Sequence, residues 1–126
     1  MIWIAVAAGG ALGSLARHGV NVLVAGRVGR SLPYGTAFVN IVGCVLIGLL
    51  AGLVASDRWP MTDAVRAFLF VGVLGGFTTF SSLGLDTFAL LREGAYPTAF
   101  WNVAGQVGLG LAAVVGGFRL GSFPAR

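Results

Sequence analysis

Four long apolar runs separated by short charged segments constrain this chain more than any other feature of its sequence. The runs cover about residues 2–24, 36–55, 65–91 and 98–120. Each is close to the ~20 residues that a helix needs to cross a hydrocarbon core of about 30 Å. Charged residues make up only 10% of the chain, too few to cover the surface of a small water-soluble domain. The sequence therefore predicts an all-α integral membrane protein, with four transmembrane helices in a single domain spanning residues 1–126.

The charged residues and the missing motifs exclude several classes of function. The net charge is +4, but the arginines are scattered singly between apolar runs, which argues against a nucleic-acid partner. Cys44 is the only cysteine, so no disulfide can form within one chain. Nucleotide-binding, zinc-protease and serine-hydrolase signatures are absent from the sequence, and we expect no enzyme activity. No basic residue precedes the first apolar run, which favours a retained helix over a signal peptide.

The distribution of arginines bears on how the chain inserts. Four crossings place both termini and the segment 56–64 on one side of the membrane. That side carries Arg58, Arg66, Arg119 and Arg126, and the other carries Arg27, Arg30 and Arg92. Four against three gives no clear positive-inside bias. Such a chain could insert in both orientations, which would permit an antiparallel homodimer.

Several polar side chains lie inside the apolar runs, where they are costly unless they have partners or a function. Arg17 in the first run is either embedded or extends its charged group to the lipid headgroups. Asn40 in the second run can bond across helices or donate to an ion. Asn102 and Gln106 lie one turn apart in the fourth run, in an interhelical seam or a polar track for an ion. Asp86 is expected to pair with Arg17 or to cap a helix.

The third run contains the most informative segment. As an unbroken helix, residues 65–91 would measure about 40 Å, longer than the membrane core. Their centre reads Gly75-Gly76-Phe77-Thr78-Thr79-Phe80-Ser81-Ser82. Glycines weaken a helix there, and hydroxyl side chains can satisfy the freed backbone groups. The pattern predicts a mid-membrane break whose carbonyls could coordinate a cation; the alternative is an unbroken, glycine-rich packing surface.

The segment 75–82 closely resembles the G-G-x-T-T-F-S-[ST] signature of the CrcB/Fluc family of fluoride channels. Residues 13–17, Gly-Ser-Leu-Ala-Arg, and residues 35–43, Gly-Thr-Ala-Phe-Val-Asn-Ile-Val-Gly, agree with the family pattern as well. The resemblance covers nearly the whole chain. It implies an antiparallel dual-topology homodimer with two fluoride pores and a structural sodium ion at the dimer interface.

The resemblance also implies roles for individual residues. The backbone carbonyls of Gly75 and Thr78 would bind sodium, and the electropositive ring edge of Phe80 would meet the anion. The remaining pore residues would be Asn40 as amide donor, Ser81, and the polar track of Asn102 and Gln106. Arg17 and Asp86 fall where the family often has a basic and an acidic residue.

Two positions depart from the family pattern. Leu83 stands where a second phenylalanine is usual, and leucine has no ring edge to offer an anion. Gln106 stands where a smaller hydroxyl residue is common. Because some family members combine two dissimilar subunits, a heterodimer with a paralogue remains open beside the homodimer.

These features together predict a passive channel that exports fluoride through the inner membrane of a microbial cell. An inside-negative potential of 100 mV favours anion exit by about 2.3 kcal/mol per charge, so no fuel is needed. One alternative is a small multidrug transporter, which would need an acid in the first helix, where this chain has Arg17. Another is a membrane subunit that transports nothing itself, including a silent partner in a heterodimer.

Overall fold

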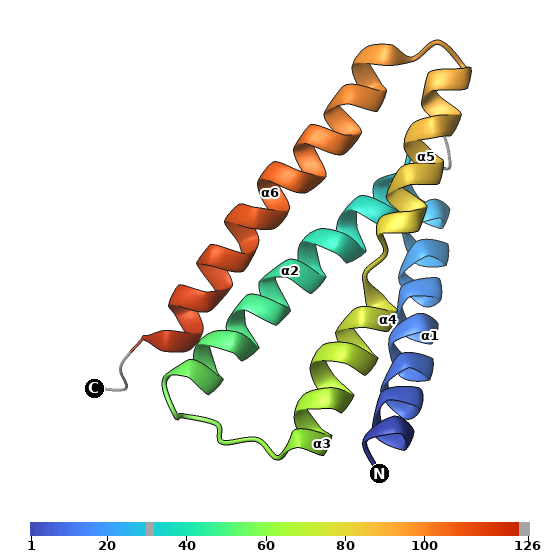
Figure 1. Ribbon diagram of the computed structural model, residues 1–126. Helices are drawn as coiled ribbons and strands as arrows, with labels where there is room; N and C mark the ends of the chain where they lie inside the picture. The colour runs from blue at the N-terminus through green and yellow to red at the C-terminus, as the bar shows by residue number, and fades with distance from the viewer. Residues whose placement is uncertain (30–31, 124–126) are drawn as a thin grey trace.

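The computed structural model describes residues 1–29 and 32–123, which form helices joined by short loops (Figure 1). In chain order the elements are α1 (Ile2–Val28), α2 (Tyr34–Ala55), α3 (Asp63–Arg66), η1 (Ala67–Leu74), α4 (Gly75–Phe77), α5 (Phe80–Arg92) and α6 (Tyr96–Ser122). The elements from α3 to α5 follow one another as a single interrupted helix, so the described chain makes four helical passes. The all-helical prediction is confirmed. Arg30 and Arg126, used above in the charge balance, lie outside the described residues.

The third pass is irregular in its middle. It begins as α3, continues as the π-helical segment η1 and the short α4, and then stops being helical at Thr78. Thr78 and Thr79 both adopt extended backbone, with φ/ψ of −84°/155° and −154°/118°, before α5 begins at Phe80. The break predicted from residues 75–82 is therefore confirmed, and the alternative of an unbroken helix is wrong.

Two pairs of helices pack closely along their length. α2 runs beside α6, and α1 runs beside η1 and α4 (Figure 1). Glycines make this possible at the α2–α6 contact, since a Cβ at Gly48 would collide with the carbonyl oxygen of Val114, and one at Gly117 with that of Val45. Close backbone approach of this kind is how helices associate in lipid, where burial of apolar surface gives no advantage.

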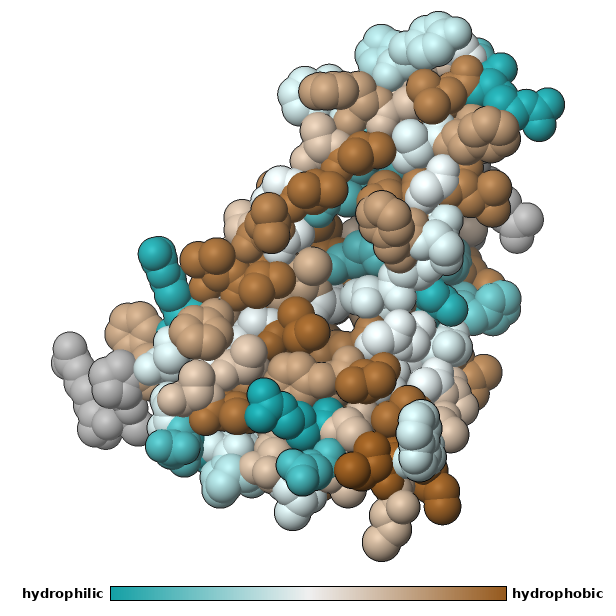
Figure 2. All heavy atoms as spheres, in the orientation of Figure 1, coloured by the Kyte–Doolittle hydropathy of each residue, from teal (hydrophilic) through white to brown (hydrophobic). Residues whose placement is uncertain are grey.

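The outer surface of the molecule is largely apolar. Figure 2 shows hydrophobic side chains gathered along the α6 arm of the visible face. On α6, Leu109 and Leu111 are 63% and 65% exposed. Within residues 1–29 and 32–123, the length and hydropathy of a membrane span are met by α2, by the pass Asp63–Arg92 and by α6. We conclude that the chain is a membrane protein. α1 has 27 residues but carries Arg17 and His18, and its crossing stays a prediction.

The ends of the chain are arranged as the four-pass topology requires. Figure 1 shows the N-terminus and the C-terminal end of α6 toward the end of the molecule that holds the loop between α2 and α3. The loop between α5 and α6 lies at the opposite end. The helix break lies partway along the third pass, beside Asn40 of α2.

Candidate functional site

The helix break is held by a side-chain amide from the neighbouring helix. The main-chain N–H of Thr79 donates to Asn40 Oδ1 at 2.8 Å, and Asn40 Nδ2 donates back to the Thr79 carbonyl at 3.2 Å. In an uninterrupted α-helix, the Thr79 N–H would instead donate to the carbonyl of Gly75. Asn40 therefore takes over a backbone partner and leaves that carbonyl without its helical donor.

The hydroxyl of Thr79 has a similar effect one turn later. Its Oγ1 accepts the main-chain N–H of Ser82 at 3.2 Å, which caps the start of α5, and also lies 3.0 Å from Ser81 Oγ. That N–H would otherwise donate to the carbonyl of Thr78. Gly75 and Thr78, the two predicted sodium ligands, are thus carbonyls whose helical donors are redirected. Oxygen ligands of this kind suit a hard cation, so the residues fit the predicted ion, whose binding stays a prediction.

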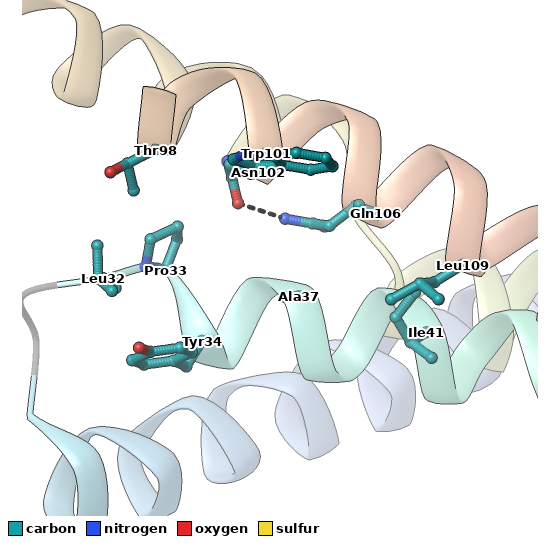
Figure 3. Close-up of a pocket in the computed structure, with 11 residues that line it drawn as sticks. Leu32, Pro33, Tyr34, Ala37, Ile41, Thr98, Trp101, Asn102, Gln106 and Leu109 are labelled. Atoms are coloured by element: carbon teal, nitrogen blue, oxygen red, sulfur yellow. Dashed lines mark hydrogen bonds between the residues drawn. The ribbon is translucent and has the colours of Figure 1, made fainter. Parts of the chain in front are cut away.

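A chain of hydrogen bonds runs from Asn40 through the interior to α5. Asn40 Nδ2 donates to Gln106 Oε1 at 2.8 Å. Gln106 Nε2 donates to Asn102 Oδ1 at 2.9 Å, the bond drawn in Figure 3. Asn102 Nδ2 donates to Thr87 Oγ1 at 2.9 Å, and the Thr87 hydroxyl donates to the Leu83 carbonyl at 2.7 Å. We call Asn40, Gln106, Asn102 and Thr87 the amide ladder. It joins α2, α6 and α5 through side chains that are otherwise surrounded by apolar residues.

Two hollows flank the amide ladder. The break hollow, about 350 Å³, is lined by residues that include Asn40, Thr79, Phe80, Leu83 and Gln106. The α2–α6 hollow, about 270 Å³, is lined by residues that include Tyr34, Thr98, Trp101, Asn102 and Gln106 (Figure 3). Gln106 lines both, although its side chain is only 8% exposed. The structure therefore supports the interhelical seam, and the hollows on either side of it give the space that a polar track needs.

The predicted pore residues near the break differ in their surroundings. Phe80, in the first turn of α5, is 83% exposed and lines the break hollow. Ser81 is exposed beside it, and its hydroxyl reaches Thr79. Leu83, which replaces the second phenylalanine of the resemblance, is 6% exposed and packs inside the chain. The roles of Asn40, Phe80, Ser81, Asn102 and Gln106 toward fluoride stay predictions.

Arg17 and Asp86 are not brought together with the amide ladder. Asp86 lines a separate hollow of about 300 Å³ together with residues that include His18, Asn21 and Thr36. In the part of the chain that the structure describes, the buried Oδ2 of Asp86 has no hydrogen-bond partner. The expectation that Asp86 pairs with Arg17 or caps a helix is therefore not met at this oxygen, and Asp86 lies inside α5 rather than at its start.

Thr87 is a member of the amide ladder that the sequence reasoning missed. It follows Thr79 and Leu83 at intervals of four residues, so these side chains share one face of the helix. The spacing could have marked Thr87 as a polar position on this face, but it could not identify its partner on α6. What hid it was the apolar Leu83 between the two threonines and a hydrogen-bond partner, Asn102, that lies on another helix.

The chain is similar to known proteins over most of its length. The family described as "CrcB-like protein, Camphor Resistance (CrcB)" matches residues 4–118. A protein of Paracoccus denitrificans named fluoride-specific ion channel FluC is 50% identical over 119 residues, covering 94% of this chain and 93% of the relative. Proteins of the same name from Thermus thermophilus and Nitrobacter winogradskyi are 48% and 45% identical, covering 94% and 93% of this chain and 94% and 92% of the relatives.

Proposed function

Because this chain belongs to the CrcB-like protein family, we propose that it is a fluoride-selective channel that lets cytoplasmic fluoride leave the cell passively through the inner membrane. The observation that carries the proposal is the amide ladder between the break hollow and the α2–α6 hollow. The ladder places oriented side-chain amides between two hollows that are lined mostly by apolar residues. The relatives named as fluoride-specific channels support the choice of ion.

The chemistry of fluoride explains why such a ladder suits it. A small, strongly hydrated anion enters a pore only if donors in the protein replace its lost water. Amide N–H groups of Asn102 and Gln106 and the hydroxyl of Ser81 are donors of the required kind. The ring of Phe80, exposed beside the break hollow, adds an electropositive edge without a full positive charge that would hold the ion too tightly.

The proposal includes assembly as an antiparallel, dual-topology homodimer with a structural sodium ion at its interface. The near balance of arginines at the two ends of the passes supports insertion in both orientations. Gly75 is exposed, and its carbonyl lacks a helical donor, which leaves it available to a cation shared with a second copy. Gly75 and Thr78 would hold the ion, which would supply a fixed positive charge between the two chains.

The decisive measurement is fluoride efflux from liposomes that hold the purified protein and are loaded with potassium fluoride. Valinomycin lets potassium leave with the anion, so charge does not accumulate. We expect rapid efflux of fluoride and little efflux of chloride. Protein-free liposomes and liposomes with a Phe80→Ala variant, in which the ring edge is removed, are the matched controls. Absence of fluoride efflux from folded protein, tested alone and with any paralogue, would overturn the proposal.

A second candidate is a subunit that works only with a dissimilar partner. Leu83 favours it, because the break hollow receives the ring of Phe80 and an aliphatic side chain where the family pattern has two rings. Under this alternative the chain alone passes no fluoride, and adding a paralogue restores efflux. The comparisons give no support to a small multidrug transporter.

A further inference from the structure

The third pass holds one residue more than its contact with α1 requires. On α1, Gly9 and Gly13 are four positions apart, and a Cβ at either would collide with a carbonyl oxygen of the third pass. These two carbonyls belong to Phe68 and Val73, which are five positions apart. Both residues lie in η1, and this wider spacing is that of a π-helix, whose hydrogen bonds join residues i and i+5.

The close contact between α2 and α6 shows no such mismatch. On α6, Gly117 and Gly121 are four positions apart, and they face the carbonyls of Val45 and Leu49, which are also four apart. π-Helices are rare and occur frequently at functional sites. Because a π-helix winds more residues into each turn than an α-helix, η1 stores one residue. If η1 became α-helical, it would advance the backbone that follows by one residue, about 1.5 Å along the axis.

The segment after η1 is suited to an advance by one residue. It consists of three doublets, Gly75-Gly76, Thr78-Thr79 and Ser81-Ser82, separated by Phe77 and Phe80. After the advance, each residue occupies the place of the next one. The second place of each doublet therefore receives a residue of the same type, whereas the place of Phe80 receives a threonine.

The second place of each doublet is also the one that makes specific contacts. A Cβ at Gly76 would collide with the Gly10 carbonyl, whereas a Cβ at Gly75 would make only ordinary contact, at 3.8 Å. The main chain of Thr79 holds the break, and its hydroxyl caps α5 by accepting the N–H of Ser82. The observed contacts thus require glycine at 76 but not at 75. A second register, in which Gly75 takes the place of Gly76, accounts for the doublet.

We propose that the third pass slips by one residue between two registers, and that the slip is a gate at the break hollow. In the observed register η1 stores the residue and Thr79 faces Asn40. In the slipped register η1 is α-helical, Thr78 faces Asn40, and the surplus residue lies beyond Ser82. One residue corresponds to a turn of about 100° around a helix axis, so the slip carries the ring of Phe80 out of the break hollow.

A fluorinated ring at position 80 reports which register the chain occupies. 4-Trifluoromethylphenylalanine at this position gives a ¹⁹F signal in fluoride-free bilayers that depends on the surroundings of the ring. Thr79→Val removes the cap of the observed register, and we expect the signal to move to that of the slipped register, in which Thr78 caps instead. The slipped register is the less stable one, so this variant still loses stability. Thr78→Val blocks the slip and should keep the observed signal; an unmoved signal in Thr79→Val would overturn the proposal.

Deleting Val71 tests the stored residue itself. Val71 lies in η1 and is 61% exposed, so its removal lets η1 become α-helical while the break keeps its observed register. We expect this variant to unfold at no lower denaturant concentration than wild type. Deleting Leu111, 65% exposed on α6, is the control and should destabilise the protein, because the α2–α6 contact has no residue to spare. A Val71 deletion as damaging as the Leu111 deletion would mean that η1 stores no surplus residue.

Combining the deletion with Thr79→Val separates the slip from a local effect of valine. Without the stored residue the chain cannot slip, so the ¹⁹F signal should return to its observed position although the cap is still missing. A signal that stays shifted in the combined variant would overturn the slip.

Fluoride efflux tests the gate, and this part rests on the proposed channel function. We expect Thr79→Val to lower efflux and the additional deletion of Val71 to restore it, because the ring returns to the break hollow. Efflux that follows the loss of the cap, and is not restored by the deletion, would refute the gate. A wild-type protein that passes no fluoride would overturn the channel function alone, since the ¹⁹F signals report the slip without fluoride.

Discussion

Thr79 serves the helix break with both its main chain and its side chain. Its N–H and carbonyl pair with Asn40, and its hydroxyl caps α5 by accepting the N–H of Ser82. The break is therefore a specified local structure in which the Thr79 N–H and carbonyl and the Ser82 N–H are satisfied within the protein, while the carbonyls of Gly75 and Thr78 keep no helical donor. In a membrane, irregular backbone is tolerated only where it is buried in protein or lines a cavity.

Replacing Thr79 with valine should weaken the start of α5. Valine has the same shape but no hydroxyl, so the Ser82 N–H loses its acceptor and the protein loses about 1–2 kcal/mol of stability. Thr79→Ser keeps the hydroxyl and should stay close to wild type. Denaturant unfolding of the two variants in detergent micelles would compare them, and equal stability would contradict the capping role.

A larger loss is expected from Asn40→Leu, which keeps the size of the side chain and removes its polar atoms. The change leaves the Thr79 N–H, the Thr79 carbonyl and Gln106 Oε1 without partners, and each buried unsatisfied group costs about 1–3 kcal/mol. Asn21→Leu is the control, because Asn21 Oδ1 has no hydrogen-bond partner among the described residues. If the two variants unfold at the same denaturant concentration, the bonds of Asn40 do not stabilise the fold.

At the scale of elements, the α2–α6 contact holds the amide ladder in register. Glycines on both helices let the backbones approach, and the ladder bonds from Asn40 to Gln106 span the same interface. A small separation of these helices would lengthen the 2.8 Å bond between the two amides. The stability of the contact and the function of the ladder are therefore linked.

Two adjacent glycines on α6 allow this link to be tested. A methyl group at Gly117 would collide with the Val45 carbonyl oxygen, whereas one at Gly116 meets nothing within 4 Å. We expect Gly117→Ala to lose about 1–3 kcal/mol through overpacking and to lower fluoride flux. Gly116→Ala should keep wild-type stability and flux, or gain slightly in stability because alanine has a higher helix propensity than glycine. Unfolding and flux measured in parallel on the two variants test this expectation. Equal stability and equal flux of Gly117→Ala and Gly116→Ala would refute the close-contact argument.

At the scale of the whole molecule, the exposed apolar side chains bear on contact with lipid or with a second copy of the chain. The weak charge bias bears on the orientation in which the chain inserts. Among the residues that the structure describes, few large side chains are buried, and these include Val39, Leu74, Leu83 and Leu90. Such a thin interior agrees with helices that pack through glycine and present their larger side chains to lipid or to another chain.

Dual topology can be measured with single cysteines at exposed loop positions. In a Cys44→Ser background, Asp57→Cys reports the α2–α3 loop and Glu93→Cys the α5–α6 end. If the chain inserts both ways, a membrane-impermeant thiol reagent added outside whole cells should label about half of the copies at each position. Full labelling at one position and none at the other would mean a single orientation and would rule out the antiparallel dimer.

Much of this architecture follows from the sequence because it depends on local composition. Apolar runs of the right length predict helices, since a backbone in lipid must satisfy its hydrogen bonds within the segment. The glycines and hydroxyl residues at 75–82 predict the break, because glycine weakens a helix and hydroxyl side chains can satisfy the backbone groups that a break frees. The interior position of Asn40, Asn102 and Gln106 was also predictable, because a polar side chain is costly where it faces lipid.

The pairing of these residues was decided only by the tertiary structure. Asn40 and Gln106 are 66 positions apart in sequence, and they meet because glycines set the offset and rotation of α2 against α6. Helical periodicity shows which residues share a face, but it does not fix how far one helix slides along another. For that reason the sequence did not reveal that Thr87 ends the ladder or that the donors of Asn40 are all in use. The helix contacts determine both, because hydrogen bonds require partners within about 3 Å.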